Sequence, residues 1–246
     1  MNEVMQFLNP RPRPPVDEHH HRDIIGGSAR AAVFGASDGL VSNVGLILGM
    51  AGAQAAAGPV RVAGLAGLVA GAISMAAGEY NSMRVQTELF EREIALERRE
   101  IERNPAVEAV ELAQRYQSRG VNPDVARELA NGLRADPELA LEFHARDELG
   151  IIPGELGSPV RAAVASFIAF AVGASLPLAP WFVTEGNSGL MASLGVALIA
   201  AVAIGVAISR FTEADVVRTV MRQVAFTAVP AVITYLIGSA IGIGLS

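Results

Sequence analysis

The chain has 246 residues, of which 51% are hydrophobic but only 5% aromatic, and its formal net charge is −6. Ala, Val, Leu and Ile supply most of the apolar content beside 25 glycines, and the mean hydropathy is +0.38, as is typical of closely packed membrane helices. The absence of cysteine excludes disulfides, thiolate metal sites and cysteine nucleophiles. The acidic charge and the lack of a nucleic-acid-binding motif argue against a nucleic-acid partner.

The N-terminal segment, residues 1–28, is polar and rich in proline. It lacks the apolar core of a cleavable signal peptide, so we expect a disordered cytoplasmic tail and a first membrane span that directs insertion. The tail contains the run His19-His20-His21. This run could trap metal, but a solvated tail is the favoured interpretation.

Five apolar stretches are long enough to cross a bilayer, which requires ~20 helical residues. They are Ala29–Ala53, Val60–Tyr80, Ala162–Val183, Leu190–Ser209 and Val224–Leu245. The sequence therefore predicts an all-α fold, a five-span integral membrane helix bundle in contact with lipid. A soluble helical protein with buried hairpins is disfavoured, because so many stretches reach spanning length.

The arginines predict the orientation of these spans. Arginines precede span one and lie between spans four and five, whereas the loop 184–189 contains none. The loop between spans one and two contains only Arg61. By the positive-inside rule the N-terminus is cytoplasmic and the C-terminus faces out, across the inner membrane if the source is a prokaryote.

Residues 85–157 separate the membrane regions 29–84 and 158–246 and read as a soluble cytoplasmic insert. Its 16 acidic residues against 9 arginines give a net charge of −7. The stretch EREIALERREIER is expected to continue span two as a protruding helix. Asn104-Pro105, Asn122-Pro123 and Asp136-Pro137 each predict a capped helix start, and Gly120 and Gly150 predict helix ends. We expect a protruding helix followed by three short helices, all acidic.

Carboxylate spacing in the insert is compatible with metal ligation. Two pairs of glutamates are three residues apart, and His144 precedes Glu148 by four, so each pair shares a helix face. The glutamate pairs are Glu97 with Glu100 and Glu108 with Glu111. If these faces converge, they offer oxygen and imidazole ligands to a divalent cation. On spacing alone, a solvated helix with ion pairs such as Glu88–Arg92 remains the favoured alternative.

The membrane spans contain ionisable residues, which are expensive there and usually face a pathway or a partner. Asp38 lies deep in span one between Gly35 and Gly39, whose spacing lets another helix approach closely. Met75 and Glu79 share a face of span two, where Gly67 and Gly71 repeat the glycine spacing. Met75 alone is often packing filler, and Glu79 could lie at the wet cytoplasmic end. Asp38 has no such alternative, so we interpret it as functional.

Three motifs carry a resemblance to a known family: SDGLVSN in span one, AGAISMAAGEY in span two, and FHARDELG at the end of the insert. They resemble the vacuolar iron transporter family, which includes nodulin-21-like proteins and the yeast calcium-sensitivity complementing transporter, in its bacterial-type form. The resemblance implies a homodimeric antiporter that exports Fe²⁺ and Mn²⁺ from the cytoplasm in exchange for protons. It also implies two metal sites. Asp38 and Met75 match the membrane site, and the insert ligands match Glu97, Glu100, Glu108, Glu111 and Glu148.

The chain departs from the plant members of that family at two places. His144 and Ala145 replace a pair of methionines, and Gly67 replaces a glutamate whose charge Glu79 could supply. Imidazole and carboxylate also suit manganese, zinc and cobalt, so the metal preference broadens beyond iron. No prosthetic group and no enzyme activity are expected, since the chain shows no nucleophile–base pair and no nucleotide loop. The alternatives are a membrane-anchored metal buffer or sensor, and a structural membrane protein.

Overall fold

The structure is a computed structural model that describes residues 27–150 and 157–243, and the described part is helical throughout. The α-helices are α2 (Ser28–Gly52), α3 (Ala57–Arg103), α4 (Pro105–Ser118), α5 (Pro123–Leu133), α6 (Pro137–His144), α7 (Pro159–Leu178), α8 (Gly186–Thr212) and α9 (Val216–Ile243). A π-helical turn, η1 (Ala145–Leu149), extends α6, and a 3-10 turn, η2 (Ala179–Phe182), extends α7. In the described part, five helices are long and apolar enough to span a membrane, which confirms the predicted fold class.

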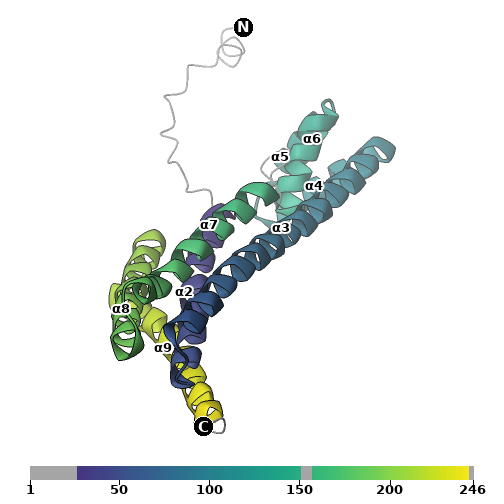
Figure 1. Cartoon of the computed structure of the whole chain (residues 1–246). Coiled ribbons are helices and arrows are strands. Elements are labelled where there is room, and N and C mark those ends of the chain that lie inside the picture. The colour runs from purple at the N-terminus through teal and green to yellow at the C-terminus, as the bar shows by residue number, and fades with distance from the viewer. Residues whose placement is uncertain (1–26, 151–156, 244–246) are drawn as a thin grey trace, which may run out of the picture.

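Helix α2 lies at the centre of the membrane bundle and packs against α3, α7, α8 and α9 (Figure 1). Its glycines allow an unusually close approach to α7. A Cβ added at Gly35 would lie 2.6 Å from the carbonyl oxygen of Ser166, and one at Gly39 would lie 2.2 Å from that of Phe170. The glycines beside Asp38 therefore bring two helix backbones together, as the sequence predicts.

Helices α2 and α9 run parallel. Ser37 exchanges hydrogen bonds with Gln223 near the start of both helices, and Gly49 lies against Gly238 near their ends. The arginines at the start of α9 therefore lie at the same membrane end as Arg30 of α2. The opposite end has Arg61, which is paired with Glu185 at 2.9 Å. The excess of arginine at one end is the asymmetry on which the predicted orientation depends.

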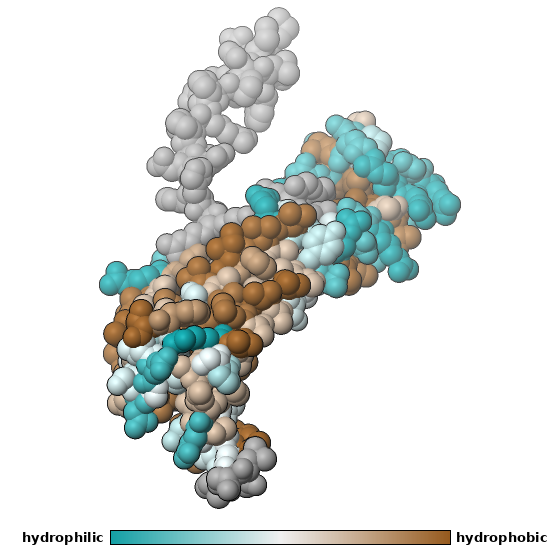
Figure 2. Space-filling view, in the orientation of Figure 1, coloured by the Kyte–Doolittle hydropathy of each residue, from teal (hydrophilic) through white to brown (hydrophobic). Residues whose placement is uncertain are grey.

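Helix α3 is continuous from the membrane into the insert. Its 47 residues correspond to about 70 Å at ~1.5 Å per residue. Figure 1 shows α3 as a long rod with α4, α5 and α6 beside its far end. Figure 2 shows an apolar body and a hydrophilic tip formed by the insert. The predicted protruding helix is confirmed, and it forms because no proline or glycine interrupts residues 79–103.

The insert helices start where the sequence predicts, each with proline in its first turn. Asn122 and Asp136 cap their helices by accepting backbone N–H bonds from Asp124 and Glu138. The expectation for Asn104 is wrong in one respect, because its side chain makes no cap. Its backbone N–H instead ends α3 by bonding the Glu100 carbonyl at 2.8 Å. A short link between two helices leaves Asn104 serving the end of the first.

Of two further sequence expectations, the structure corrects one and does not test the other. The fifth span begins at Val216, eight residues before the predicted Val224, because Asp215 accepts the Arg218 N–H at 2.7 Å and starts the helix in a polar stretch. The second concerns the N-terminal tail. His19, His20 and His21 lie outside the described residues, and the tail therefore stays a prediction.

Candidate metal centre

Three polar side chains of the insert converge from three different helices. Glu97 is on α3, Glu108 on α4 and His144 at the end of α6, and one ligand atom from each lies within 4.8 Å of the others. His144 Nδ1 is 2.8 Å from Glu97 Oε1 and 3.8 Å from Glu108 Oε2. All three residues are buried, with exposed fractions of 6%, 8% and 2% respectively. We call these three residues the insert cluster.

Two atoms of the insert cluster have no hydrogen-bond partner among the described residues: Glu97 Oε1 and His144 Nδ1. They lie 2.8 Å apart, which places the ring nitrogen and the carboxylate oxygen in ion-pair contact when the imidazole is protonated. Buried groups of this kind cost free energy unless something else satisfies them. A cation placed among the three residues would do so.

Burial and mutual repulsion shift the ionisation of the insert cluster. Burial raises the pKa of Glu108 above its ordinary value, and the nearby Glu111, Glu97 and Glu100 carboxylates raise it further, while His144 works in the opposite sense. Burial works to lower the pKa of His144, but the carboxylates of Glu97, Glu108 and Glu148 outweigh it, and the net shift is upward. The carboxylate contributions to these two pKa shifts reflect a local excess of negative charge that a divalent cation would neutralise.

The donor set fits a transition-metal ion. Oxygen and imidazole nitrogen ligands lie at ~2.0–2.2 Å from such ions, so two ligands of one ion are at most ~4.4 Å apart. The longest separation in the insert cluster, within 4.8 Å, closes with a small side-chain shift. Carboxylate with imidazole suits Mn²⁺, Fe²⁺ and Zn²⁺, and it does not select strongly among them.

The remaining predicted insert ligands lie around the cluster but are placed differently. Glu100 and Glu111 are exposed and act on Glu108 through their charge. Glu148 Oε2 is 3.8 Å from His144 Nδ1, while its other oxygen is 2.9 Å from Arg115. Glu148 therefore borders the cluster and is held by an arginine.

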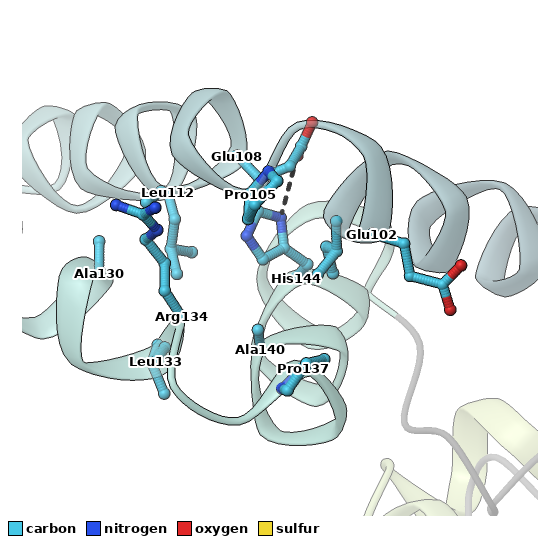
Figure 3. A pocket seen from close by; sticks show the side chains of 12 residues that line it. Glu102, Pro105, Glu108, Leu112, Ala130, Leu133, Arg134, Pro137, Ala140 and His144 are labelled. Atoms are coloured by element: carbon cyan, nitrogen blue, oxygen red, sulfur yellow. Dashed lines mark ion pairs between the residues drawn. The ribbon is translucent and has the colours of Figure 1, made fainter.

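An apolar pocket of about 310 Å³ opens beside the insert cluster. Figure 3 shows Glu108 and His144 at its upper wall, Leu112, Ala130 and Leu133 around it, and Glu102 pointing away. The apolar wall lowers the local polarity on one side of the cluster. That environment strengthens the attraction between a bound cation and the carboxylates.

A second group of candidate residues lies in the membrane bundle. Asp38 and Ser42 of α2 and Met75 and Glu79 of α3 line an open groove of about 380 Å³. The ring of Phe170 from α7 completes the groove, since Phe170 lies against Gly71. The three predicted membrane residues, Asp38, Met75 and Glu79, thus share one groove.

Glu79 is buried at the insert-facing end of the groove and forms an ion pair with Arg30 of α2. Arg30 lies eight residues, about two helical turns, before Asp38 on the same side of α2. This spacing could have identified Arg30 in the sequence as a residue near the groove. Arg115, which holds Glu148, had no comparable signal, because its partner belongs to a helix distant in sequence. Sequence reasoning identified neither arginine.

Comparisons with known proteins agree with this arrangement. The sequence profile described as the VIT family matches residues 29–239, which includes both the groove and the insert cluster. This chain belongs to the VIT family. The match covers well over half of the chain and confirms the resemblance to the vacuolar iron transporter family, while the bacterial-type form stays a prediction.

Individual VIT relatives are similar over most of their length. The chain is 32% identical to vacuolar iron transporter 1 of Oryza sativa subsp. japonica over 198 residues, 79% of each chain. It is 32% identical to vacuolar iron transporter 1 of Arabidopsis thaliana over 217 residues, 86% of each. It is 40% identical to the vacuolar iron transporter of Acanthamoeba castellanii over 167 residues, 67% of this chain and 60% of that protein.

VIT membership and the five spanning helices together identify a multi-pass membrane protein of a transporter family. The membership confirms the prediction that the chain is not an enzyme.

Proposed function

We propose that this chain exports divalent transition metal, Fe²⁺ and also Mn²⁺, from the cytoplasm in exchange for protons. The insert cluster collects the ion, and Asp38 and Met75 bind it in the membrane groove. The observation that carries the proposal is that α3 contributes residues to two separate candidate ligand sets, one inside the bundle and one outside it. The similarity to vacuolar iron transporters supports iron as the transported ion.

Proton exchange follows from the ligands themselves. Carboxylate and imidazole must be deprotonated to bind a metal, so metal binding releases protons and protonation releases metal. Asp38 holds one or the other, which is the elementary step of an exchange cycle. Glu79, paired with Arg30, adds a second carboxylate at the end of the groove nearest the insert.

We also propose the orientation and assembly of the transporter. The end of the bundle that contains Arg30 and the insert faces the cytoplasm, because arginine accumulates there. Two copies associate through the lipid-facing side of α3, which exposes Leu65, Val69 and Ile73 in the single chain. The groove formed by α2 and α3 is open on one side, and a second copy would close it.

The test is metal flux in sealed liposomes with an imposed pH gradient. We expect purified protein to move Fe²⁺ and Mn²⁺ with counter-movement of protons, reported by a trapped pH dye. Asp38→Asn, which is nearly isosteric but unable to ionise, should abolish flux. Asp124→Asn is the matched control, because Asp124 is exposed on α5 and, among the described residues, its side chain pairs with Arg127 in its own helix turn.

The result also separates the transporter from the alternative of a metal buffer or sensor. A buffer binds metal through the insert cluster but passes none across the membrane. Metal binding without flux in the unmodified protein would favour that alternative. Flux that survives Asp38→Asn would remove Asp38 from the pathway.

A further inference from the structure

Two arginines lie on the side of α9 that points away from the rest of the bundle. Arg218 and Arg222 are four residues apart, about one helical turn, so their side chains share one side of the helix. The opposite side of α9 packs against α2 and α8. Its buried polar residues, each with an exposed fraction of 6% or less, are Thr219, Gln223 and Thr227. The two arginines therefore face whatever surrounds the bundle.

The side chains of Arg218 and Arg222 are exposed and have no carboxylate partner in the described part of the chain. The arginine–carboxylate ion pairs found there all involve other arginines. Asp215, the nearest acidic residue in sequence, instead caps α9 by accepting the backbone N–H of Arg218 at 2.7 Å. Like charges one helical turn apart repel each other. A counter-ion between the two guanidinium groups would remove that repulsion.

The length of α9 places these arginines at the depth of the lipid headgroups. Its 28 residues correspond to about 42 Å at ~1.5 Å per residue, whereas the hydrocarbon core of a bilayer is ~30 Å thick. Below the arginines the same side of the helix is apolar, and Val229, Val232 and Leu236 have exposed fractions of 58%, 55% and 60%. We call these five residues the outer face of α9: Arg218, Arg222, Val229, Val232 and Leu236.

We propose that the outer face of α9 binds an anionic phospholipid, whose phosphate lies between Arg218 and Arg222 and whose acyl chains follow the apolar residues. Guanidinium suits this partner, because its planar set of N–H groups donates paired hydrogen bonds to phosphate oxygens. Basic sites beside membrane helices recognise anionic headgroups in this way. The inference is independent of the ion that the protein transports.

The orientation of the protein does not by itself account for this arrangement. The positive-inside rule explains an excess of arginine at one membrane end. It does not require two arginines one turn apart on a single lipid-facing side, above an apolar stripe and without a carboxylate partner. The spacing of the pair and the apolar residues below it are what fit a phospholipid.

The test is binding of phosphatidylglycerol, with a fluorophore on one acyl chain, to the full-length protein in a neutral detergent. Arg218→Gln and Arg222→Gln each remove one cation and keep a long polar side chain. The start of α9 is retained in both variants, because Asp215 accepts from the backbone of residue 218. We expect each variant to weaken the apparent affinity about fivefold, the effect of one arginine at an anionic membrane surface.

Arg161→Gln is the matched control for the loss of one positive charge. Arg161 is exposed at the start of α7, and α7 runs parallel to α2 and begins at the same membrane end. It is the one basic residue of that helix, so no second guanidinium lies a turn away. We expect Arg161→Gln to bind phosphatidylglycerol as the unmodified protein does. A general attraction between anionic lipid and a basic surface would instead weaken equally in all three variants.

Three competitors identify what the outer face of α9 recognises. Unlabelled phosphatidylglycerol should displace the probe, whereas phosphatidylcholine, whose headgroup has no net charge, should displace it far less. Glycerol 3-phosphate offers the phosphate without acyl chains and should not displace the probe. Displacement by glycerol 3-phosphate as effective as that by phosphatidylglycerol would show a free-phosphate site and overturn the lipid assignment. Unchanged affinity in both Arg218→Gln and Arg222→Gln, or an equal loss in Arg161→Gln, would overturn the role of the arginine pair.

Discussion

Gly39 is the point of closest approach between α2 and α7, and a single methyl group there should disturb both stability and transport. A Cβ at Gly39 would lie 2.2 Å from the carbonyl oxygen of Phe170, whereas ordinary contact begins at 3.4 Å. Gly39→Ala must therefore move the two helices apart by about 1 Å, since the obstacle is backbone and cannot rotate away. Overpacking of this kind costs about 1–3 kcal/mol.

Gly45→Ala is the control for this change. Gly45 is buried on the same helix, but a Cβ there would lie 3.6 Å from Thr234, an ordinary contact. Alanine is favoured over glycine in a helix by about 1 kcal/mol, so Gly45→Ala should be neutral or stabilising. Because Gly39→Ala gains the same helix propensity, the difference between the two variants isolates the steric cost.

The assay is thermal unfolding of the purified protein in one detergent, followed by flux in liposomes. We expect Gly39→Ala to melt below the unmodified protein and Gly45→Ala to melt at or above it. Phe170 also lines the groove, so a shift of α7 should reduce flux in Gly39→Ala. Equal melting temperatures for the two variants would refute the close approach of α2 and α7.

Two further predictions concern the insert. Four glutamates of the insert are replaced by Gln: Glu97, Glu100, Glu108 and Glu111. The change should weaken metal binding by the full-length protein and slow transport at low metal concentration. Unchanged metal affinity in titration calorimetry would show that these glutamates are solvated surface residues and not ligands. Because the pKa of His144 is raised by its carboxylate neighbours, metal binding should weaken as pH falls through that raised value. In the metal-free protein the same histidine should stabilise the insert fully below its ordinary pKa of ~6.5, and this stabilisation should fade as pH rises through the raised value. His144→Met should bind metal with less dependence on pH and lose more affinity for Mn²⁺ than for Fe²⁺, and identical pH profiles would show that His144 is not a ligand.

Local signals were sufficient to predict most of the fold. Apolar length marks the spans, and Asn-Pro or Asp-Pro pairs mark the insert helices, because each signal depends on only a few adjacent residues. The start of α9 was missed, because its first two turns contain Arg218 and Arg222 and extend beyond the apolar stretch. Hydropathy detects the part of a helix that lies in lipid, and it does not detect the polar turns that precede it.

The site was harder to predict because it depends on how helices cross. Glu97 and Glu100 share a face by spacing, yet only Glu97 is buried, where it contacts His144 of α6. The same holds for Glu108 and Glu111. The hydrogen bond from the buried Asn43 amide to the Ala174 carbonyl could likewise not be predicted from the sequence, because a distant helix, α7, supplies the acceptor. The spacing of residues along one helix shows which side chains share a face, but the packing of the helices decides which of them come into contact.

The unbroken α3 fixes the spacing between the two proposed metal sites. Glu79 at the end of the groove and Glu97 in the insert cluster lie on the same straight helix, about 27 Å apart at ~1.5 Å per residue. An ion therefore cannot pass directly from one ligand set to the other, and it must cross water. An ion confined to a hemisphere of that radius has an effective concentration of about 40 mM. If the proposed metal sites are correct, each ion that the insert releases would therefore be far more concentrated at the mouth of the groove than in the surrounding solution.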